Sequence, residues 1–237
     1  MTAVSYSHIG GRTNNQDYYY PQEGGVSMLY IICDGAGGKP YGEVASKLCC
    51  GAIAEYIAQH TVAEMTEEYI DALYSHVKKE FVDTETKYPE MKGMATTIVL
   101  VAMDGAGAVV AWMGDSRLYH ISNGAVKYVT QDHSLVSELT QAGKIKKAQV
   151  AGIKNIITRA MSAGSEQPLA WHRIKKGEMS KGDYICMCTD GVLENVNDAL
   201  LLEILAANDT LAEKRDRLID TCMGKTKDNF TFTLIEL

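Results

Sequence analysis

Short loops between apolar runs constrain the fold of this 237-residue chain more than any other feature. Asn123-Gly124 separates two such runs by only two residues, a spacing and composition typical of a type I′ β-hairpin. A parallel connection needs a dozen residues or more, so strands joined this way are antiparallel. Runs rich in β-branched and aromatic residues predict strands at Val4–Ile9, Met28–Cys33, Thr97–Met103, Ala108–Met113, Arg117–Ile121, Ala125–Val129, Tyr184–Cys188 and Phe230–Ile235.

Helical patterns interrupt these strands in blocks. Apolar residues recur every four positions from Val44 to Tyr56, which predicts a helix over about Gly42–Gln59. Similar spacing predicts further helices over Glu67–Tyr88 and Leu211–Met223. Strand blocks broken by helix blocks indicate an α+β protein in which helices cover antiparallel sheets.

No repeat, low-complexity segment or Pro/Ser-rich linker marks a boundary, so residues 1–237 are expected to form a single domain. A domain of this length buries roughly 70–75% of the surface of its unfolded chain, enough to fold without a disulfide or structural metal. The pattern weakens between Ser134 and Met161, where Lys144, Lys146, Lys147 and Gly152 fit either a mobile flap or a plain solvated helix and loop.

Charge and cysteine content narrow the classes of function. With 23 Lys and Arg against 30 Asp and Glu, the net charge of −7 opposes binding to nucleic acid or to anionic lipid. No apolar run approaches the length of a membrane span, and Met1–Gly10 does not resemble a secretion signal. The six cysteines lack zinc-site spacing and are expected to be reduced, buried thiols. We therefore expect a soluble, cytoplasmic monomer.

Asp34-Gly35-Ala36-Gly37-Gly38 joins the strand Met28–Cys33 to the helix that begins near Gly42. An acid at the end of a buried strand is exposed where glycines let backbone carbonyls approach a ligand closely. A phosphate-binding Walker loop is excluded, because Cys33 and Pro40 stand where that motif requires Gly and Ser or Thr. A ligand role for Asp34 therefore stays open.

The same four letters, Asp-Gly-Ala-Gly, return at residues 104–107 between two apolar strands. At that hairpin spacing Asp104 is better explained as a turn residue than as a ligand.

Other acids also stand at strand ends. Asp17 follows the first strand, Asp190 follows Tyr184–Cys188, and Asp228 precedes the last strand. Taken singly, Asp190-Gly191 and Asp228-Asn229 are better explained as turns. Taken together, these carboxylates form an all-oxygen set, which Mg²⁺ and Mn²⁺ prefer and zinc and copper do not. The chemistry they indicate is phosphoryl transfer.

The ordered set of motifs resembles the protein phosphatase type 2C family, the metal-dependent Ser/Thr phosphatases, in its short bacterial form. The resemblance covers about Gly10 to Leu234. The matching segments are Arg12–Asp17, Asp34–Gly38 with Gly42-Glu43 and Ala45-Ser46, Met94–Thr97, Gly114–Tyr119, Thr130–Ser134, Ile157–Ala160, Thr189–Gly191 and Asp228–Thr231. Each motif alone is weak, but their shared order is specific.

The resemblance implies a four-layer α/β/β/α sandwich of two antiparallel sheets flanked by helices, with a binuclear Mn²⁺ or Mg²⁺ centre at one edge. By the same resemblance, Asp34 bridges both ions and Gly35 adds its carbonyl oxygen. Asp190 and Asp228 hold the other ion, while Asp17 and Gln16 anchor metal-associated waters. Asp115 is the position for a third, weaker ion.

Arg12 is implied by the resemblance to grip the substrate phosphate, and the alternative for this residue is a surface ion pair. The sequence also departs from the family pattern. Gln16 replaces the commoner Glu, and Ala36 stands where animal members carry His and bacterial members usually Met. Ala95, Thr189 and Ser162 replace Gly, Ser and Gly, which we expect to be packing changes.

The predicted function is a protein-serine/threonine phosphatase, a phosphoric monoester hydrolase of signalling proteins. Two ions would activate a bridging water for in-line attack on the phosphomonoester. Its expected partners are phosphorylated Ser/Thr proteins and, by family habit, a cognate Ser/Thr kinase. The alternatives are a metal-free regulatory or binding relative and a phosphatase of small molecules. Retention of Asp34, Asp190 and Asp228 argues against the first, because buried carboxylates repel one another.

Overall fold

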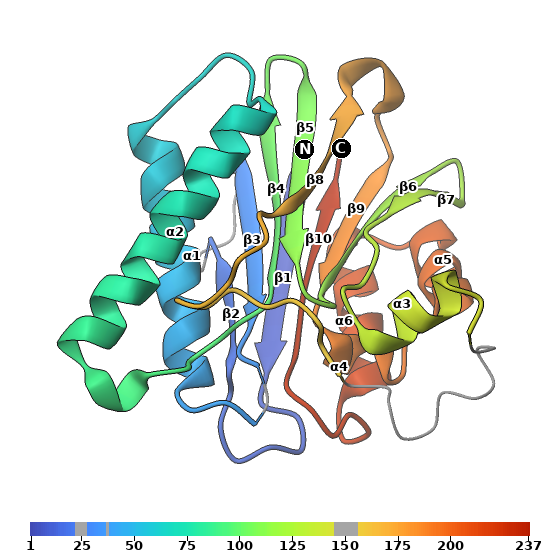
Figure 1. The fold of residues 1–237 in the computed structure, drawn as a ribbon. Coiled ribbons are helices and arrows are strands. Elements are labelled where there is room, and N and C mark those ends of the chain that lie inside the picture. Colours follow the sequence, from blue (N-terminus) through green and yellow to red (C-terminus); the bar gives the residue numbers. More distant parts are fainter. Residues whose placement is uncertain (22–27, 37, 145–155) are drawn as a thin grey trace.

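Two five-stranded antiparallel sheets pack face to face with helices outside them in the computed structural model, which describes residues 1–21, 28–36, 38–144 and 156–237 (Figure 1). The first sheet has the order β1 (Thr2–His8), β10 (Phe230–Glu236), β9 (Tyr184–Cys188), β6 (Arg117–Ser122) and β7 (Ala125–Val129). The second has the order β2 (Asp17–Tyr20), β3 (Leu29–Asp34), β4 (Ile98–Asp104), β5 (Gly107–Met113) and β8 (Ala170–Lys175).

Helices cover the outer face of each sheet. Those packed on the second sheet are α1 (Gly42–Gln59) and α2 (Glu67–Lys87), and those on the first are α4 (Asp190–Leu193), α5 (Asp198–Ala206) and α6 (Leu211–Cys222). The chain also forms α3 (Leu135–Gln141) and the short 3-10 turns η1 (Pro89–Met91) and η3 (Lys176–Glu178). The predicted four-layer α/β/β/α sandwich is confirmed.

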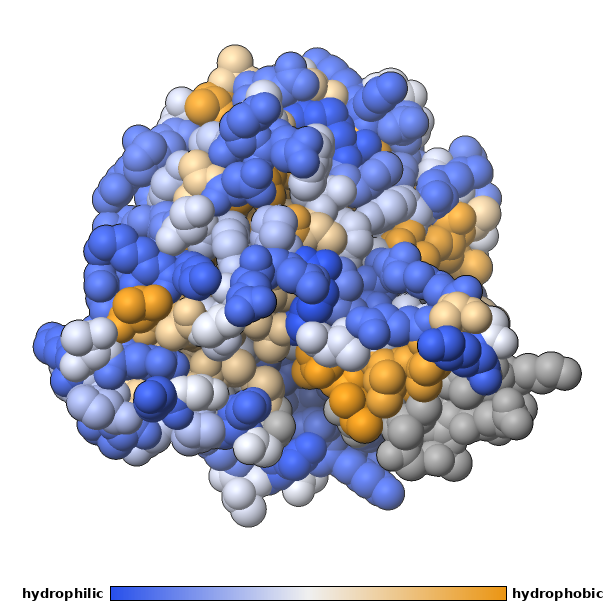
Figure 2. Space-filling model, viewed as in Figure 1, coloured by the Kyte–Doolittle hydropathy of each residue, from blue (hydrophilic) through white to orange (hydrophobic). Residues whose placement is uncertain are grey.

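Alternation along the strands builds three apolar layers. In β3, Ile32 lies in the layer between the sheets, whereas Ile31 lies in the layer beneath α1 and α2. A strand places successive side chains on opposite faces, so a strand covered on both sides is apolar throughout. Hydrophilic residues make up most of the molecular surface visible in Figure 2.

Most predicted elements agree with the structure. The helix α1 has the predicted bounds, and Asn123 and Gly124 have φ of 53° and 68°, the positive values that a type I′ turn requires. The sequence missed the short strands β2 and β8 and the helices α4 and α5. Part of the Ser134–Met161 segment is the helix α3, while Lys146, Lys147 and Gly152 lie outside the described residues.

The cysteines are free and buried, as predicted. Within the described residues, no helix is long and apolar enough to cross a membrane.

Antiparallel pairing brings several strand ends to one edge of the sandwich. The first residue of β2, Asp17, pairs with the last residue of β3, Asp34. In the other sheet, Arg117 at the start of β6 pairs with Cys188 at the end of β9. The turn before β6 and the turn after β9 are therefore neighbours, and each carries an aspartate.

Candidate active site

Asp17 and Asp34 face each other across the β2–β3 pair. Like charges directly opposite in a sheet destabilise it, so this pairing needs a compensating reason. The backbone of Asp34 is fixed on both sides, since its N–H donates to Thr97 Oγ1 at 3.0 Å and its carbonyl accepts from Thr97 N at 2.8 Å and Thr96 Oγ1 at 2.8 Å. The position of the Asp34 carboxyl group is therefore set by a rigid strand end.

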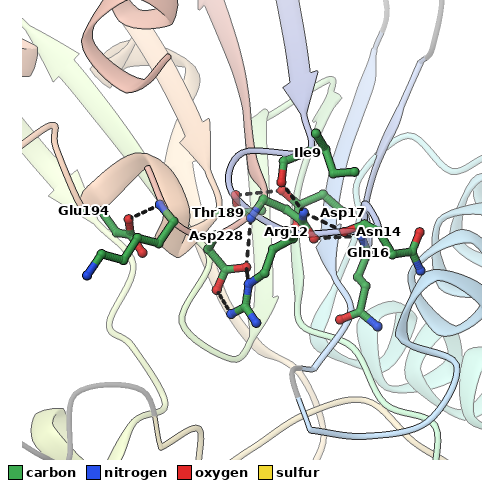
Figure 3. Close-up of polar contacts among 10 residues, drawn as sticks. Ile9, Arg12, Asn14, Gln16, Asp17, Thr189, Glu194 and Asp228 are labelled. Atoms are coloured by element: carbon green, nitrogen blue, oxygen red, sulfur yellow. Dashed lines mark hydrogen bonds and ion pairs between the residues drawn. The ribbon is translucent and has the colours of Figure 1, made fainter. Parts of the chain in front are cut away.

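Asp190 begins the short helix α4 directly after β9. Its neighbour Gly191 lets the chain before β10 come close, because a Cβ on Gly191 would lie 1.9 Å from the carbonyl oxygen of Asn229. The hydroxyl of Thr189 donates to Asp17 Oδ2 at 3.0 Å (Figure 3). Thr189 thus orients a site carboxylate, which is more than the packing change expected from the sequence.

Asn229 ties the N-terminal loop to the start of β10, a role that the sequence did not reveal. Its Nδ2 donates to the carbonyls of Ile9 and Asn14, both at 2.8 Å, and its Oδ1 accepts from Gln16 N at 2.8 Å (Figure 3). The adjacent Asp228 is thereby held beside the segment that carries Arg12. These contacts join residues more than 200 positions apart, so no local pattern could indicate them.

Arg12 forms a two-pronged ion pair with Asp228 (Figure 3). Its Nε donates to Oδ1 at 2.8 Å and its Nη2 to Oδ2 at 2.6 Å. The Arg12 side chain is 53% exposed, so its guanidinium also faces solvent. The ion pair considered as the alternative for Arg12 is present in the structure, and its partner is a predicted metal ligand.

The predicted acids form one electrostatic cluster. Burial, followed by the charges of Asp17, Asp190, Asp115 and Asp228, raises the pKa of Asp34 well above its usual value. Burial likewise raises the pKa of Asp17 to about 7, although hydrogen bonds from Thr231 and Thr189 oppose the shift. Such shifts record carboxylates that lack enough nearby positive charge.

The remaining two buried acids behave in the same way. Burial and the charges of Asp190 and Asp132 raise the pKa of Asp115 to about 7. Burial and the charges of Asp228 and Glu194 raise the pKa of Asp190 to about 6, against a hydrogen bond with Asp34 that lowers it. The structure therefore brings Asp17, Asp34, Asp115, Asp190 and Asp228 together, with Arg12 as their cationic neighbour.

Two carboxylate oxygens without hydrogen-bond partners indicate whether these residues suit a metal ion. Asp17 Oδ1 and Asp115 Oδ1 are buried and have no hydrogen-bond partner among the described residues. A buried carboxylate oxygen without a partner is costly, and hard divalent cations take such oxygens as ligands. Within the same residues, no three acid, His or Cys side chains stand ready in chelating positions. The donor chemistry of the cluster nevertheless fits Mg²⁺ or Mn²⁺.

Gly35 and Gln16 lie between the cluster and the start of α1. A Cβ on Gly35 would lie 2.4 Å from the backbone of Gly42, so only glycine lets β3 and α1 approach this closely. Gly35 N donates to the Gln16 carbonyl at 3.0 Å, and Gln16 Nε2 lies 3.4 Å from Glu43 Oε2. Ala36 is buried and has no side-chain proton to donate.

Comparisons with known proteins agree with this geometry. A family model described as Protein phosphatase 2C matches residues 4–221. The serine/threonine phosphatase stp of Listeria innocua is 31% identical over 214 residues, which cover 88% of this chain and 84% of that protein.

Two solved structures extend the match to the fold. The crystal structure of the serine/threonine phosphatase Stp1 from Staphylococcus aureus has a TM-score of 0.86 and 27% identity, over 100% of this chain and 95% of that one. The catalytic domain of the phosphatase PstP, solved with two manganese ions, has a TM-score of 0.82 and 27% identity, over 99% and 96%.

Proposed function

Since this chain belongs to the protein phosphatase 2C family, we infer that it is a metal-dependent protein-serine/threonine phosphatase, and we propose a role for each residue of its acidic cluster. The observation that supports these roles most is the gathering of five aspartates beside Arg12, with two carboxylate oxygens left unpartnered among the described residues. Structural ion pairs balance their charges, whereas this cluster is arranged to take positive charge from a ligand.

We propose that Asp34 is the shared ligand of two divalent ions, because it is the acid on which the charges of the other four act together. Asp190 and Asp228 would hold one of these ions, and Gly35 would contribute its carbonyl oxygen. Asp17 and Gln16 would orient water, and Asp115 would hold a third, weaker ion. When bound, such ions act as Lewis acids toward phosphoryl oxygens and lower the pKa of water. We propose Mn²⁺ or Mg²⁺, in keeping with the all-oxygen donors.

Arg12 would bind the phosphate of the substrate. Its planar guanidinium can form two parallel hydrogen bonds to a phosphoryl group, and half of its side chain is exposed. Asp228 would hold the guanidinium in place from the other side. Because Ala36 offers no proton, the departing serine or threonine oxygen would take its proton from water.

We further propose that the chain acts as one cytoplasmic, monomeric domain. Six free, buried cysteines suit a reducing compartment. Phosphorylated Ser/Thr proteins in a signalling pathway would be its substrates, and a Ser/Thr kinase its functional counterpart. The metal-free binding relative is not favoured, since it would have no use for unpartnered, mutually repelling acids.

The test is phosphate release from a phosphothreonine peptide with and without Mn²⁺. We expect release only with the metal, and its loss in Asp34→Ala. The matched control is Asp83→Asn, which removes an exposed acid of α2 that pairs with Lys79. Activity on small phosphate esters but on no phosphopeptide would instead identify a small-molecule phosphatase, and no metal-dependent release from any substrate would identify a binding module.

A further inference from the structure

The structure contains a pocket of about 320 Å³, and Met113, Thr158, Arg159, Ser162, Ser165 and Gln167 are among the residues that line it. The pocket is linked to the site through the backbone of Met161, which lies between the lining residues Ala160 and Ser162 and pairs with Thr96. Thr96 exchanges backbone hydrogen bonds of 3.0 and 2.8 Å with Met161, and its hydroxyl donates to the Asp34 carbonyl. Neighbouring strands lie about 4.8 Å apart, so Met161 stands roughly 10 Å from the Asp34–Gly35 backbone, across two strand spacings.

Arg159 differs from every other arginine of the chain. The other arginines, at positions 12, 117, 173, 215 and 217, each form an ion pair with an Asp or Glu. Among the described residues Arg159 has no carboxylate partner within ion-pair distance, and its Nε is buried without any hydrogen-bond partner. Burial lowers the pKa of this guanidinium, and the charges of Tyr74 and Glu138 oppose the shift without cancelling it.

The two contacts that Arg159 does make leave donor capacity free. Its Nη2 donates to the Pro168 carbonyl, and its Nη1 lies 3.1 Å from His133 Nε2. The other ring nitrogen, His133 Nδ1, accepts from Gly114 N at 3.2 Å. Burial and the charge of Arg159 lower the pKa of His133 to about 4, so the ring is neutral near pH 7. A neutral imidazole has only one acceptor nitrogen, so it can satisfy Gly114 or Arg159 but not both.

We propose that the Arg159 pocket binds the carboxylate of an Asp or Glu that flanks the phosphorylated Ser or Thr of the protein substrate. This inference rests on the proposed phosphatase function and adds a preference for acidic sequences. Nη1 and Nη2 of Arg159 each carry a second N–H beyond the contacts with His133 and Pro168, and two such donors at the end of a guanidinium match the two oxygens of a carboxylate. The backbone separation of roughly 10 Å between Met161 and Asp34–Gly35 equals the length of about three residues of extended peptide. The acid is therefore expected within a few positions of the phosphorylated residue.

The experiment compares phosphothreonine peptides that carry Glu or Gln at each of the four positions on either side, assayed with Mn²⁺. We expect the wild type to hydrolyse the best Glu peptide with a kcat/KM about tenfold higher than its Gln counterpart, mainly through KM. Arg159→Gln should bring this ratio close to one, and Arg159→Lys should keep part of it. Each ratio is taken within one variant, so a general loss of folded enzyme cancels.

Substitutions at two exposed residues that line the pocket test the proposed subsite independently, because they leave the half-buried arginine in place. Gln167→Glu adds a negative charge of nearly the same shape and should lower the preference for Glu peptides. Glu166→Gln removes one and should raise it. Glu90→Gln, on the exposed η1 turn, is the matched control and should leave the ratio unchanged.

The outcomes separate the two proposals. No phosphate release from any peptide would overturn the phosphatase function itself. Equal hydrolysis of Glu and Gln peptides by the wild type, or a preference that survives in Arg159→Gln and in Gln167→Glu, would overturn the acidic subsite and leave the phosphatase function intact.

Discussion

Asp34 and Asp104 are each the first residue of an Asp-Gly-Ala-Gly segment, but the groups around their carboxylates differ. The Asp104 side chain is only 1% exposed, but both of its oxygens accept hydrogen bonds from Arg173 at 2.9 Å, and the N–H groups of Met65, Ala106 and Gly107 add three more. Burial alone would raise the pKa of Asp104, but the hydrogen bonds from Arg173, Met65 and Ala106 outweigh it and lower the pKa to about 2.

Asp34 has other acids where Asp104 has donors. Its pKa moves in the opposite direction for that reason. The comparison teaches that a buried aspartate is structural when the fold supplies its donors and functional when the fold withholds them. Asp104 is a turn residue, as predicted, and its ion pair with Arg173 adds a second structural role.

The largest difference between the two aspartates should appear when each carboxylate is removed in turn. The first of these variants is Asp34→Asn. We expect phosphatase kcat/KM to fall at least about 10³-fold, or roughly 4 kcal/mol, because the proposed shared ligand is lost. The stability of the metal-free protein should stay equal or rise, since one repelling charge is gone. Enzyme kinetics with Mn²⁺ and thermal melts in chelator measure the two effects. Full activity in this variant would remove Asp34 from the site.

The reciprocal change, Asp104→Asn, should spare the chemistry and damage the fold. Breaking this buried ion pair leaves Arg173 with its longer 3.7 Å contact to the exposed Glu64. The loss costs about 3 kcal/mol, which corresponds to a Tm lower by about 6–12 °C for a domain of this size. We expect kcat to be unchanged well below that Tm. Arg173→Met added to Asp104→Asn should recover part of the loss, whereas a purely local turn defect would show no recovery.

The sequence predicted those parts of the fold and the site that short-range sequence patterns determine. Hairpin turns and helix periodicity act over a few residues, so the Asn123-Gly124 turn and α1 were predicted with their bounds. The strand β8 was missed because it carries His172 and Arg173 in place of an apolar run. The resemblance supplied the acids of the site, whereas the Arg12 pair with Asp228 spans 216 positions and depends on tertiary packing alone.

The pH dependence of stability should separate the two kinds of acid in metal-free protein. Asp17, Asp115 and Asp190 have folded pKa values of about 7, 7 and 6, above the usual value near 4. The native state therefore binds more protons than the unfolded state between about pH 4 and 7, and stability falls as pH rises through that window.

Asp104 contributes the opposite slope, with stability that is present above about pH 4 and lost as the pH falls toward 2. Each group can change the free energy of unfolding by up to about 1.4 kcal/mol per pH unit. Denaturant titrations from pH 3 to 8 in chelator should show a maximum near pH 4 to 5, and Mn²⁺ should move it upward. Metal-free stability that rises steadily from pH 5 to 7 would contradict an uncompensated cluster.

The smallest effect concerns Gln16, which lies beside the cluster and places its Nε2 3.4 Å from Glu43 Oε2. Gln16→Glu would set two carboxylates against each other, so we expect metal-free stability to fall by about 1 kcal/mol and Mn²⁺ to bind a few-fold more tightly. Adding Glu43→Gln should restore the stability and keep the tighter binding. The matched control is Gln59→Glu, since Gln59 donates to Glu55 at 2.9 Å on exposed α1. Mn²⁺ titrations should show a change in metal affinity for Gln16→Glu but not for Gln59→Glu, and thermal melts measure the stability of each variant. Equal Mn²⁺ affinity in these two variants would mean that the charge of the cluster does not set metal binding.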